Sequence, residues 1–297
     1  MKKALIFLFV FLTGIVFSQK MISFERDGYI YTANIDGSNQ KKILEGYQHS
    51  ISPDGHYISY TYNLNTKRYP AIYDIAAEKT AKFESASNGN GYFPVYSPDG
   101  KYLVFSDFIL SNWAISMVDI AGVKVTILSS GANNIGFHSP RWAPDSKSVI
   151  CHDLGLVYEF DITGIPVKQF DFRTVMRSQE IYPSSISSFA YNKDKTALIF
   201  DNDWNWEETA PEKACLFRYD IAANTISMIT DINMVSLAPF IDYTSGKIYF
   251  AGCIKKDIKL DKNGEADIKW NVYRINEDSS NLEKVIENAH SPTVSQF

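Results

Sequence analysis

Cysteine, clusters of basic residues and long apolar runs are all scarce in this 297-residue chain. The three cysteines, Cys151, Cys215 and Cys253, lack the C-x-x-C spacing of redox and zinc sites, and an odd count allows at most one disulfide. The formal net charge is −5, and no lysine- and arginine-rich run provides the positive footprint that a nucleic-acid partner needs. These absences argue against a disulfide scaffold and against nucleic-acid binding.

Local signatures of common enzymes are missing too. The chain contains no G-x-S-x-G, H-E-x-x-H, P-loop or G-x-G-x-x-G motif, which mark serine hydrolases, zinc proteases and nucleotide sites. Apolar residues do not recur at helical spacing for more than a turn or two, so long amphipathic helices are not expected. We predict an all-β protein without a cofactor or a bound metal, and we expect binding rather than catalysis.

The single long apolar run, residues 4–17, follows two lysines at the start of the chain. This pattern predicts a signal peptide over residues 1–18, cleaved after Ser18. The run has 14 residues, fewer than the roughly 20 that a membrane-spanning helix needs. We therefore expect a periplasmic or secreted protein whose mature part, residues 19–297, is one domain without a membrane span.

A turn followed by a strand of roughly alternating residues of β-forming type occurs five times along the chain. The copies are ISPDGHYISY (51–60), YSPDGKYLVF (96–105), WAPDSKSVIC (142–151), YNKDKTALIF (191–200) and DYTSGKIYF (242–250). Their equivalent turn positions, Asp54, Asp99, Asp145, Asp194 and Ser245, are 45, 46, 49 and 51 residues apart. Proline presets φ in such a turn, the aspartate side chain caps it, and glycine accepts the positive φ that closes it.

A second series of strands interleaves with the first and has six members. These strands end at Asn34, Asp74, Asp119, Asp161, Asp220 and Asn276. About four short strands per 45–51 residues are typical of a propeller blade. Residues 21–44 supply only three strands, whereas HSPTVSQF (290–297) resembles HSPRWAPD (138–145), where a blade begins. We predict a six-bladed β-propeller of four-stranded blades whose first blade is completed by the C-terminal strand.

The segments SPDGKYLVF and ISMVDIAG, repeated at this length behind a signal peptide, resemble the TolB-like six-bladed propellers of bacterial envelopes. The resemblance covers roughly residues 21–297. It implies the propeller fold and a location in the cell envelope. Function does not follow from a fold alone.

Two histidines stand at equivalent places in the repeat. His138 and His290 both lie two residues before the proline of the innermost strand, so we expect them near the central channel. Some pectin-degrading lyases with TolB-like propellers hold a divalent metal with channel-facing histidines, and neutral imidazole is a suitable ligand. We favour structural or channel-lining histidines here, and the metal site is the alternative.

Two further segments have unusual compositions. DNDWNWEETAPEK (201–213) is predicted to be a long loop between the second and third strands of blade five, with Trp204 and Trp206 packed on the blade or displayed to a partner. DKNGEAD (261–267) is rich in oxygen ligands but lacks the spacing of a calcium loop. Its Asn-Gly pair predicts a hairpin.

We name the strands of a blade a to d, from the channel outward. The a–b and c–d turns lie on one face of the ring, and the b–c and d–a loops lie on the other. Because binding residues concentrate on irregular loops, we expect the ligand at the channel mouth on the b–c/d–a face. The candidate binding residues are Trp204, Trp206, Tyr47, Tyr92, His138 and His290.

The expected function is that of an exported, non-catalytic propeller that binds a protein, a peptide or an envelope glycan. The alternative is a lyase-like, polysaccharide-degrading enzyme with a histidine and metal site facing the channel.

Overall fold

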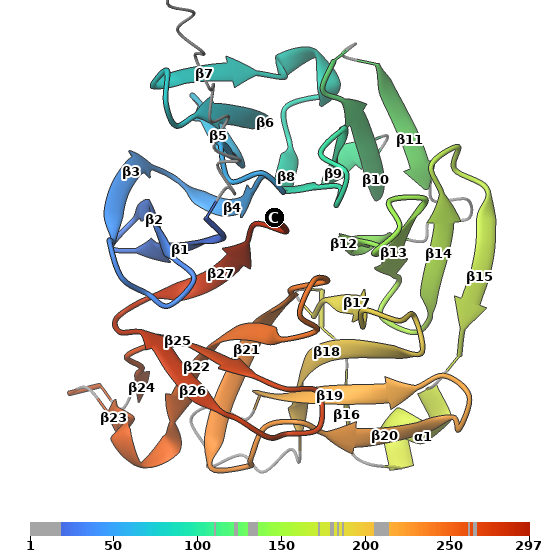
Figure 1. The fold of residues 1–297 in the computed structure, drawn as a ribbon. Coiled ribbons are helices and arrows are strands. Elements are labelled where there is room, and N and C mark those ends of the chain that lie inside the picture. Colours follow the sequence, from blue (N-terminus) through green and yellow to red (C-terminus); the bar gives the residue numbers. More distant parts are fainter. Residues whose placement is uncertain are drawn as a thin grey trace, which may run out of the picture.

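Six antiparallel sheets form a closed ring in the computed structural model of the chain (Figure 1). The structure describes residues 19–109, 111–121, 124–129, 136–171, 173–178, 181–182, 184–185, 187–204, 214–260, 262–263 and 266–297. No helix among them is long and apolar enough to cross a membrane. The predicted all-β, six-bladed propeller is confirmed.

The strands of each blade follow one another outward from the centre of the ring. Blade 1 is β27 (His290–Val294), β1 (Met21–Arg26), β2 (Tyr29–Asn34) and β3 (Lys41–Glu45); blade 2 is β4 (Tyr47–Ile51), β5 (Tyr57–Leu64), β6 (Lys67–Asp74) and β7 (Lys79–Lys82). Blade 3 is β8 (Gly91–Tyr96), β9 (Tyr102–Ile109), β10 (Asn112–Asp119) and β11 (Val125–Ser129); blade 4 is β12 (His138–Trp142), β13 (Ser148–His152), β14 (Val157–Asp161) and β15 (Pro166–Phe170). Blade 5 is β17 (Phe189–Tyr191), β18 (Ala197–Trp204), β19 (Ala214–Asp220) and β20 (Thr225–Met228); blade 6 is β21 (Met234–Ile241), β22 (Ile248–Ile254), β25 (Asn271–Ile275) and β26 (Glu283–Ile286).

A few short elements decorate the blades. They are the helices η1 (Glu84–Ala86), α1 (Arg173–Ser178) and η3 (Lys255–Asp257), the strand β16 (Ile181–Tyr182), and the pair β23 (Lys259–Leu260) and β24 (Ala266–Asp267). β23 and β24 pair with each other, so the hairpin predicted around residues 261–267 is confirmed.

The ring closes in blade 1, as the sequence predicts. The C-terminal strand β27 pairs antiparallel with β1, and the register places Val294 opposite Ile22. Both side chains are fully buried, at 1 % and 0 % exposure. Closure removes the open sheet edge that would otherwise offer unpaired N–H and C=O groups to another chain.

Asp54, Asp99 and Asp145 cap their turns, as expected from the sequence. Asp99 accepts hydrogen bonds from the Ser97 hydroxyl (2.7 Å) and from the Lys101 backbone N–H (3.2 Å), while Gly100 has a φ of 75°. In the two copies without glycine, Ser146 and Lys195 occupy this place with φ values of 59° and 57°. A left-handed conformation costs a non-glycine residue roughly 1–2 kcal/mol, which the surrounding turn must offset.

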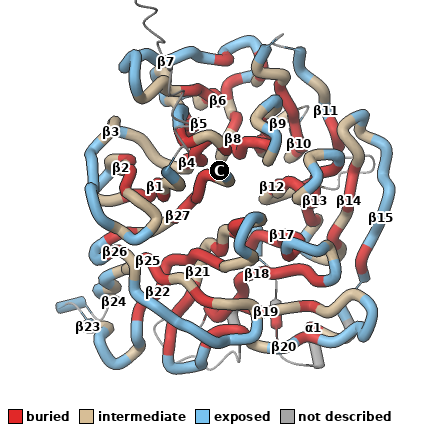
Figure 2. Tube along the Cα trace, viewed as in Figure 1, coloured by how far each residue is buried: buried red, intermediate tan, exposed pale blue. Residues whose placement is uncertain are grey.

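Apolar side chains are packed between neighbouring blades, and the outer strands carry most of the exposed residues (Figure 2). Trp142 shows how the blades lock together. Its indole N–H in blade 4 donates to the Val95 carbonyl in blade 3 (3.0 Å), and its ring stacks on Tyr102 with centroids 6.1 Å apart. The three cysteines are buried in three different blades, at Cys151, Cys215 and Cys253.

The predicted loop over residues 201–213 begins too early, and this boundary is wrong. Strand β18 continues to Trp204, because its polar end pairs on both sides: Asp203 lies opposite Ala214 of β19 and Tyr182 of β16. The extra strand β16 pairs with the backbone N–H and C=O groups at the end of β18, which would otherwise lack hydrogen-bond partners on that side.

Candidate ligand-binding site at the channel mouth

The innermost strands bend at equivalent positions around the channel. Five non-glycine residues there have left-handed φ values between 50° and 53°: Gln48, Phe93, Ser139, Ala238 and Ser291. Each lies where the pairing between strands a and b changes register. A β-bulge of this kind bends the strand and re-aims its side chains, so the bulges shape the mouth of the channel.

Side chains of one blade accept hydrogen bonds from the bulge residues of the next blade. The backbone N–H groups of Gln48, Phe93 and Ala238 donate to Glu25 (2.8 Å), Thr61 (3.0 Å) and Asp201 (3.0 Å), respectively. Each acceptor belongs to strand b of the preceding blade. These polar contacts therefore fix neighbouring blades to one another beside the channel.

A cavity of about 510 Å³ opens on the b–c/d–a face. It is lined by Gln48, Tyr92, Phe93, Ser106, Trp113, His138, Ser139, Arg141 and Ser185. We call it the mouth cavity. Two predicted binding residues, Tyr92 and His138, lie in its wall.

An aromatic corner forms one side of the mouth cavity. The Trp113 ring, at the start of β10, lies 5.3 Å from the Tyr92 ring and 5.3 Å from the Phe108 ring, tilted by 50° and 67°. The guanidinium of Arg68 covers the Tyr92 ring at 4.0 Å from its centroid, a cation–π geometry. Each ring of this wall therefore packs against a neighbouring side chain.

Two histidines lie behind the aromatic corner, with ring centroids 5.8 Å apart. Burial lowers the pKa of His138, and burial followed by the charge of His138 lowers the pKa of His152 to about 4. His152 Nε2 donates to the Ser187 carbonyl (2.9 Å), and its Nδ1 accepts the Leu154 N–H (3.2 Å), which is the pattern of a neutral ring.

A third histidine, His49, belongs to a series of hydrogen-bonded side chains that resembles a hydrolase triad. His49 contacts the Ser23 hydroxyl through Nε2 (2.9 Å) and Glu25 through Nδ1 (3.2 Å). Ser23 and His49 are only 0 % and 1 % exposed, and the Ser23 hydroxyl also contacts that of Thr293 (2.6 Å). Because no substrate reaches a buried hydroxyl, this network joins β27, β1 and β4 and acts in ring closure.

Two other predicted site residues, Tyr47 and His290, do not line the mouth cavity. The Tyr47 hydroxyl donates to Asn63 (3.0 Å), and His290 Nδ1 lies 4.0 Å from a Glu25 oxygen in blade 1. Trp204 ends β18 opposite Ile181, and Trp206 falls outside the described residues. Of the four predicted residues whose side chains the structure describes, Tyr92 and His138 come together at the mouth cavity.

Arg141 is the residue that the sequence analysis missed, although a signal for it exists. Its equivalents in blades 1, 2, 3 and 6 lie two residues after the left-handed bulge residue, as Arg141 lies two after Ser139, and its equivalent in blade 5 lies four residues before Asp194; they are Thr293, Ser50, Val95, Phe240 and Ala190. A single charged side chain at a position that is uncharged in every other blade marks a place where the ring departs from its own symmetry.

We expect the purified protein to contain no stoichiometric zinc, manganese or calcium. No three His, Cys, Asp or Glu side chains in the described part of the chain are grouped so as to hold a metal ion. Elemental analysis of the purified protein measures this directly. About one metal per chain, lost on His138→Ala, would contradict the prediction and favour the lyase-like alternative.

Comparisons with solved structures confirm the fold. TolB from Acinetobacter baumannii superposes with a TM-score of 0.65 at 16% identity, over 94% of this chain and 67% of that one. Putative TolB from Agrobacterium tumefaciens gives 0.58 at 16% identity, over 92% and 91%. An oligogalacturonate lyase in complex with manganese gives 0.51 at 12% identity, over 87% and 70%.

No family model matches the chain, and no curated protein matches it either. The structural similarity to TolB propellers, at this low identity, therefore shows a shared six-bladed fold.

Proposed function

We propose that this protein is an exported, non-catalytic propeller that binds a protein segment, a peptide or an envelope glycan in the mouth cavity. The observation that carries the proposal is the cavity itself: about 510 Å³, preformed, and walled by aromatic rings next to a few polar groups. Ligand sites commonly combine a concave aromatic lining with a small number of polar groups. The apolar leader over residues 1–18 and the TolB-like fold support a place in the envelope.

A lyase-like, polysaccharide-degrading enzyme is the second candidate. Its support is the pair His138 and His152 beside the cavity, together with the shared fold of the oligogalacturonate lyase. His152 counts against it, because both of its ring nitrogens already have partners.

Trp113→Ala is expected to weaken capture of the ligand by about 30-fold or more, because a buried aromatic anchor contributes roughly 2 kcal/mol or more to binding. The measurement is capture from envelope extract by immobilised protein, with the retained material analysed for both peptides and sugars. Unfolding temperatures of the variants are measured alongside.

Tyr57→Ala is the matched control, since Tyr57 is an exposed aromatic residue beside the repeated turn on the opposite face. It should leave capture unchanged. Equal capture by the wild type and Trp113→Ala would reject the mouth cavity as the binding site. A large fall in unfolding temperature would show that Trp113 serves mainly to hold the blade.

A further inference from the structure

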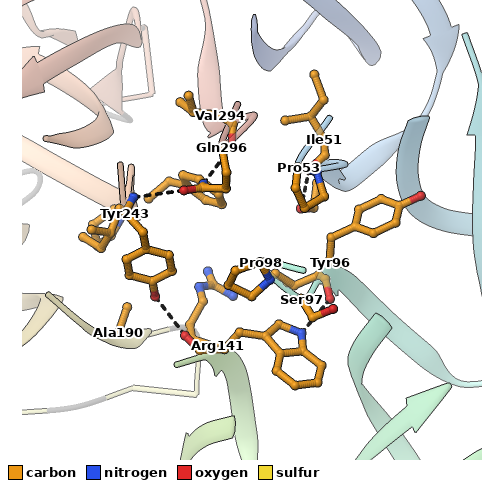
Figure 3. A pocket seen from close by; sticks show the side chains of 16 residues that line it. Ile51, Pro53, Tyr96, Ser97, Pro98, Arg141, Ala190, Tyr243, Val294 and Gln296 are labelled. Atoms are coloured by element: carbon orange, nitrogen blue, oxygen red, sulfur yellow. Dashed lines mark hydrogen bonds between the residues drawn. The ribbon is translucent and has the colours of Figure 1, made fainter. Parts of the chain in front are cut away.

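Arg141 stands where the channel narrows. Its side chain borders the mouth cavity and two small cavities further in, of about 20 and 40 Å³. The innermost of these is lined by strands of all six blades, with Ile51, Tyr96, Trp142, Ala190, Ile241 and Val294 among its residues. Figure 3 shows the Arg141 side chain running into the space between Tyr243 and Pro98.

The guanidinium of Arg141 has no carboxylate partner among the described residues. None of their ion pairs includes it. Its one side-chain hydrogen bond within this part of the chain goes to the Pro140 carbonyl (3.1 Å), and it lies over the Phe93 ring at 4.8 Å. A guanidinium carries five N–H donors in a planar fork, so most of its donors remain available.

Asp201 is the acid whose charge acts on Arg141, and its oxygens are already engaged. One accepts the Ser188 N–H (3.0 Å) and the other accepts the Ala238 N–H (3.0 Å). Burial lowers the pKa of Arg141 to about 10, which leaves it charged at neutral pH. Arg141 is half-buried, and a partly desolvated cation without an ion-pair partner among the described residues is costly for stability; such costs concentrate at functional sites.

We propose that Arg141 is an anion-binding subsite at the floor of the mouth cavity, and that it takes the carboxylate of a peptide whose adjacent apolar side chain lies against Trp113. The location rests on the proposed function. The planar fork of arginine matches a carboxylate with two parallel hydrogen bonds. The drop from about 510 Å³ to 20 and 40 Å³ at Arg141 means that only a small terminal group reaches it.

The aromatic corner favours a peptide over an acidic sugar. A pyranose ring stacks on an open, flat aromatic face, but the Tyr92 face is covered by Arg68 at 4.0 Å, and the rings beside Trp113 are tilted by 50° and 67°. A corner of this shape encloses a branched or aromatic side chain. An acidic sugar is therefore the alternative that the test must separate.

The probe is N-acetyl-phenylalanine, which joins one carboxylate to one aromatic side chain. A ligand of roughly 15 heavy atoms at about 0.3 kcal/mol per atom binds in the millimolar range. Titration into labelled full-chain protein is followed by the NMR signals of the Arg141 Nε–H and the Trp113 indole N–H. We expect both signals to shift and saturate together.

N-acetyl-phenylalaninamide, which lacks the carboxylate, should bind about tenfold or more weakly, because a hydrogen-bonded charge pair is lost. A third probe carries an aspartate side chain and a C-terminal amide. It shows whether Arg141 binds a side-chain carboxylate or the carboxylate at the end of a peptide chain. Arg141→Gln should reduce the affinity for the acid to that of the amide without lowering the unfolding temperature. Lys101→Gln removes one charge from the opposite face and should change nothing.

Three results would overturn the subsite. Equal affinity for acid and amide would leave an apolar pocket without an anion site. A shift of the Arg141 signal with glucuronate but not with N-acetyl-phenylalanine would assign the anion to a glycan. No shift with any probe would reject Arg141 as an anion site. The proposed function would not fall with it, because the capture experiment with Trp113→Ala tests ligand binding in the mouth cavity separately. If Arg141→Gln unfolds, Arg141→Lys gives the same comparison with the charge retained and the fork removed.

Discussion

Deleting residues 290–297 is expected to leave a protein that is insoluble or does not unfold cooperatively. The deletion removes the whole of β27 and exposes the edge of β1, where Ile22 is fully buried. Each large apolar side chain released from such a site costs roughly 1.5–3 kcal/mol. The total stability of a domain is only about 5–15 kcal/mol, so the loss of a blade's inner strand removes most of it.

The deletion also breaks a buried polar network. Thr293 contacts the Ser23 hydroxyl (2.6 Å) and accepts the Ile51 N–H (2.9 Å), and Ser23 in turn contacts His49 (2.9 Å). Leaving these buried groups without partners costs about 1–3 kcal/mol each.

Removing Phe297 alone is the matched control. This residue is 62% exposed and lies beyond β27, so its loss should leave unfolding by circular dichroism nearly unchanged. A chain without residues 290–297 that melts at the wild-type temperature would show that β27 does not hold the ring closed.

The blade architecture could be predicted because its determinants are local and repeated. The turn at Asp99 is held by hydrogen bonds to residues two positions away in the sequence, and five copies of the turn recur at similar spacing. The extent of β18 could not be predicted in this way. Its last two residues, Asp203 and Trp204, pair with β16, a two-residue strand too short to leave a periodic signal.

The candidate site was predicted only in part, for a different physical reason. Tyr92 and His138 could be found because they lie at the start of innermost strands, next to the d–a loops at the mouth of the channel. Trp113 and Arg68 meet Tyr92 through packing of three strands, which no spacing along the chain encodes. Arg141 could have been found by comparing repeat positions for charge as well as for apolar pattern.

Acid is expected to destabilise the fold between about pH 6.5 and pH 4 through His152. Burial, first, and the charge of His138, second, lower the pKa of this ring from 6.5 to about 4. Between these values the unfolded chain binds a proton that the folded state does not, so stability is full above pH 6.5 and falls as the pH drops towards 4. This difference in pKa corresponds to about 3 kcal/mol in the free energy of unfolding, at roughly 1.36 kcal/mol per pKa unit.

His152→Gln isolates this contribution, because glutamine keeps an N–H donor for the Ser187 carbonyl but does not titrate. Asp99 and Glu159 have pKa values lowered by hydrogen bonds from Ser97 and Ser148, against the opposing effect of burial, so they also lose stabilising charge at acid pH. Their effect falls mainly below pH 4 and is common to both proteins. The free energy of unfolding in urea, measured from pH 7 to pH 4, should therefore decline less steeply in His152→Gln. Parallel curves over this range would mean that His152 gains its proton in the folded state, with the cost of burial relieved by a neighbour such as Asp153.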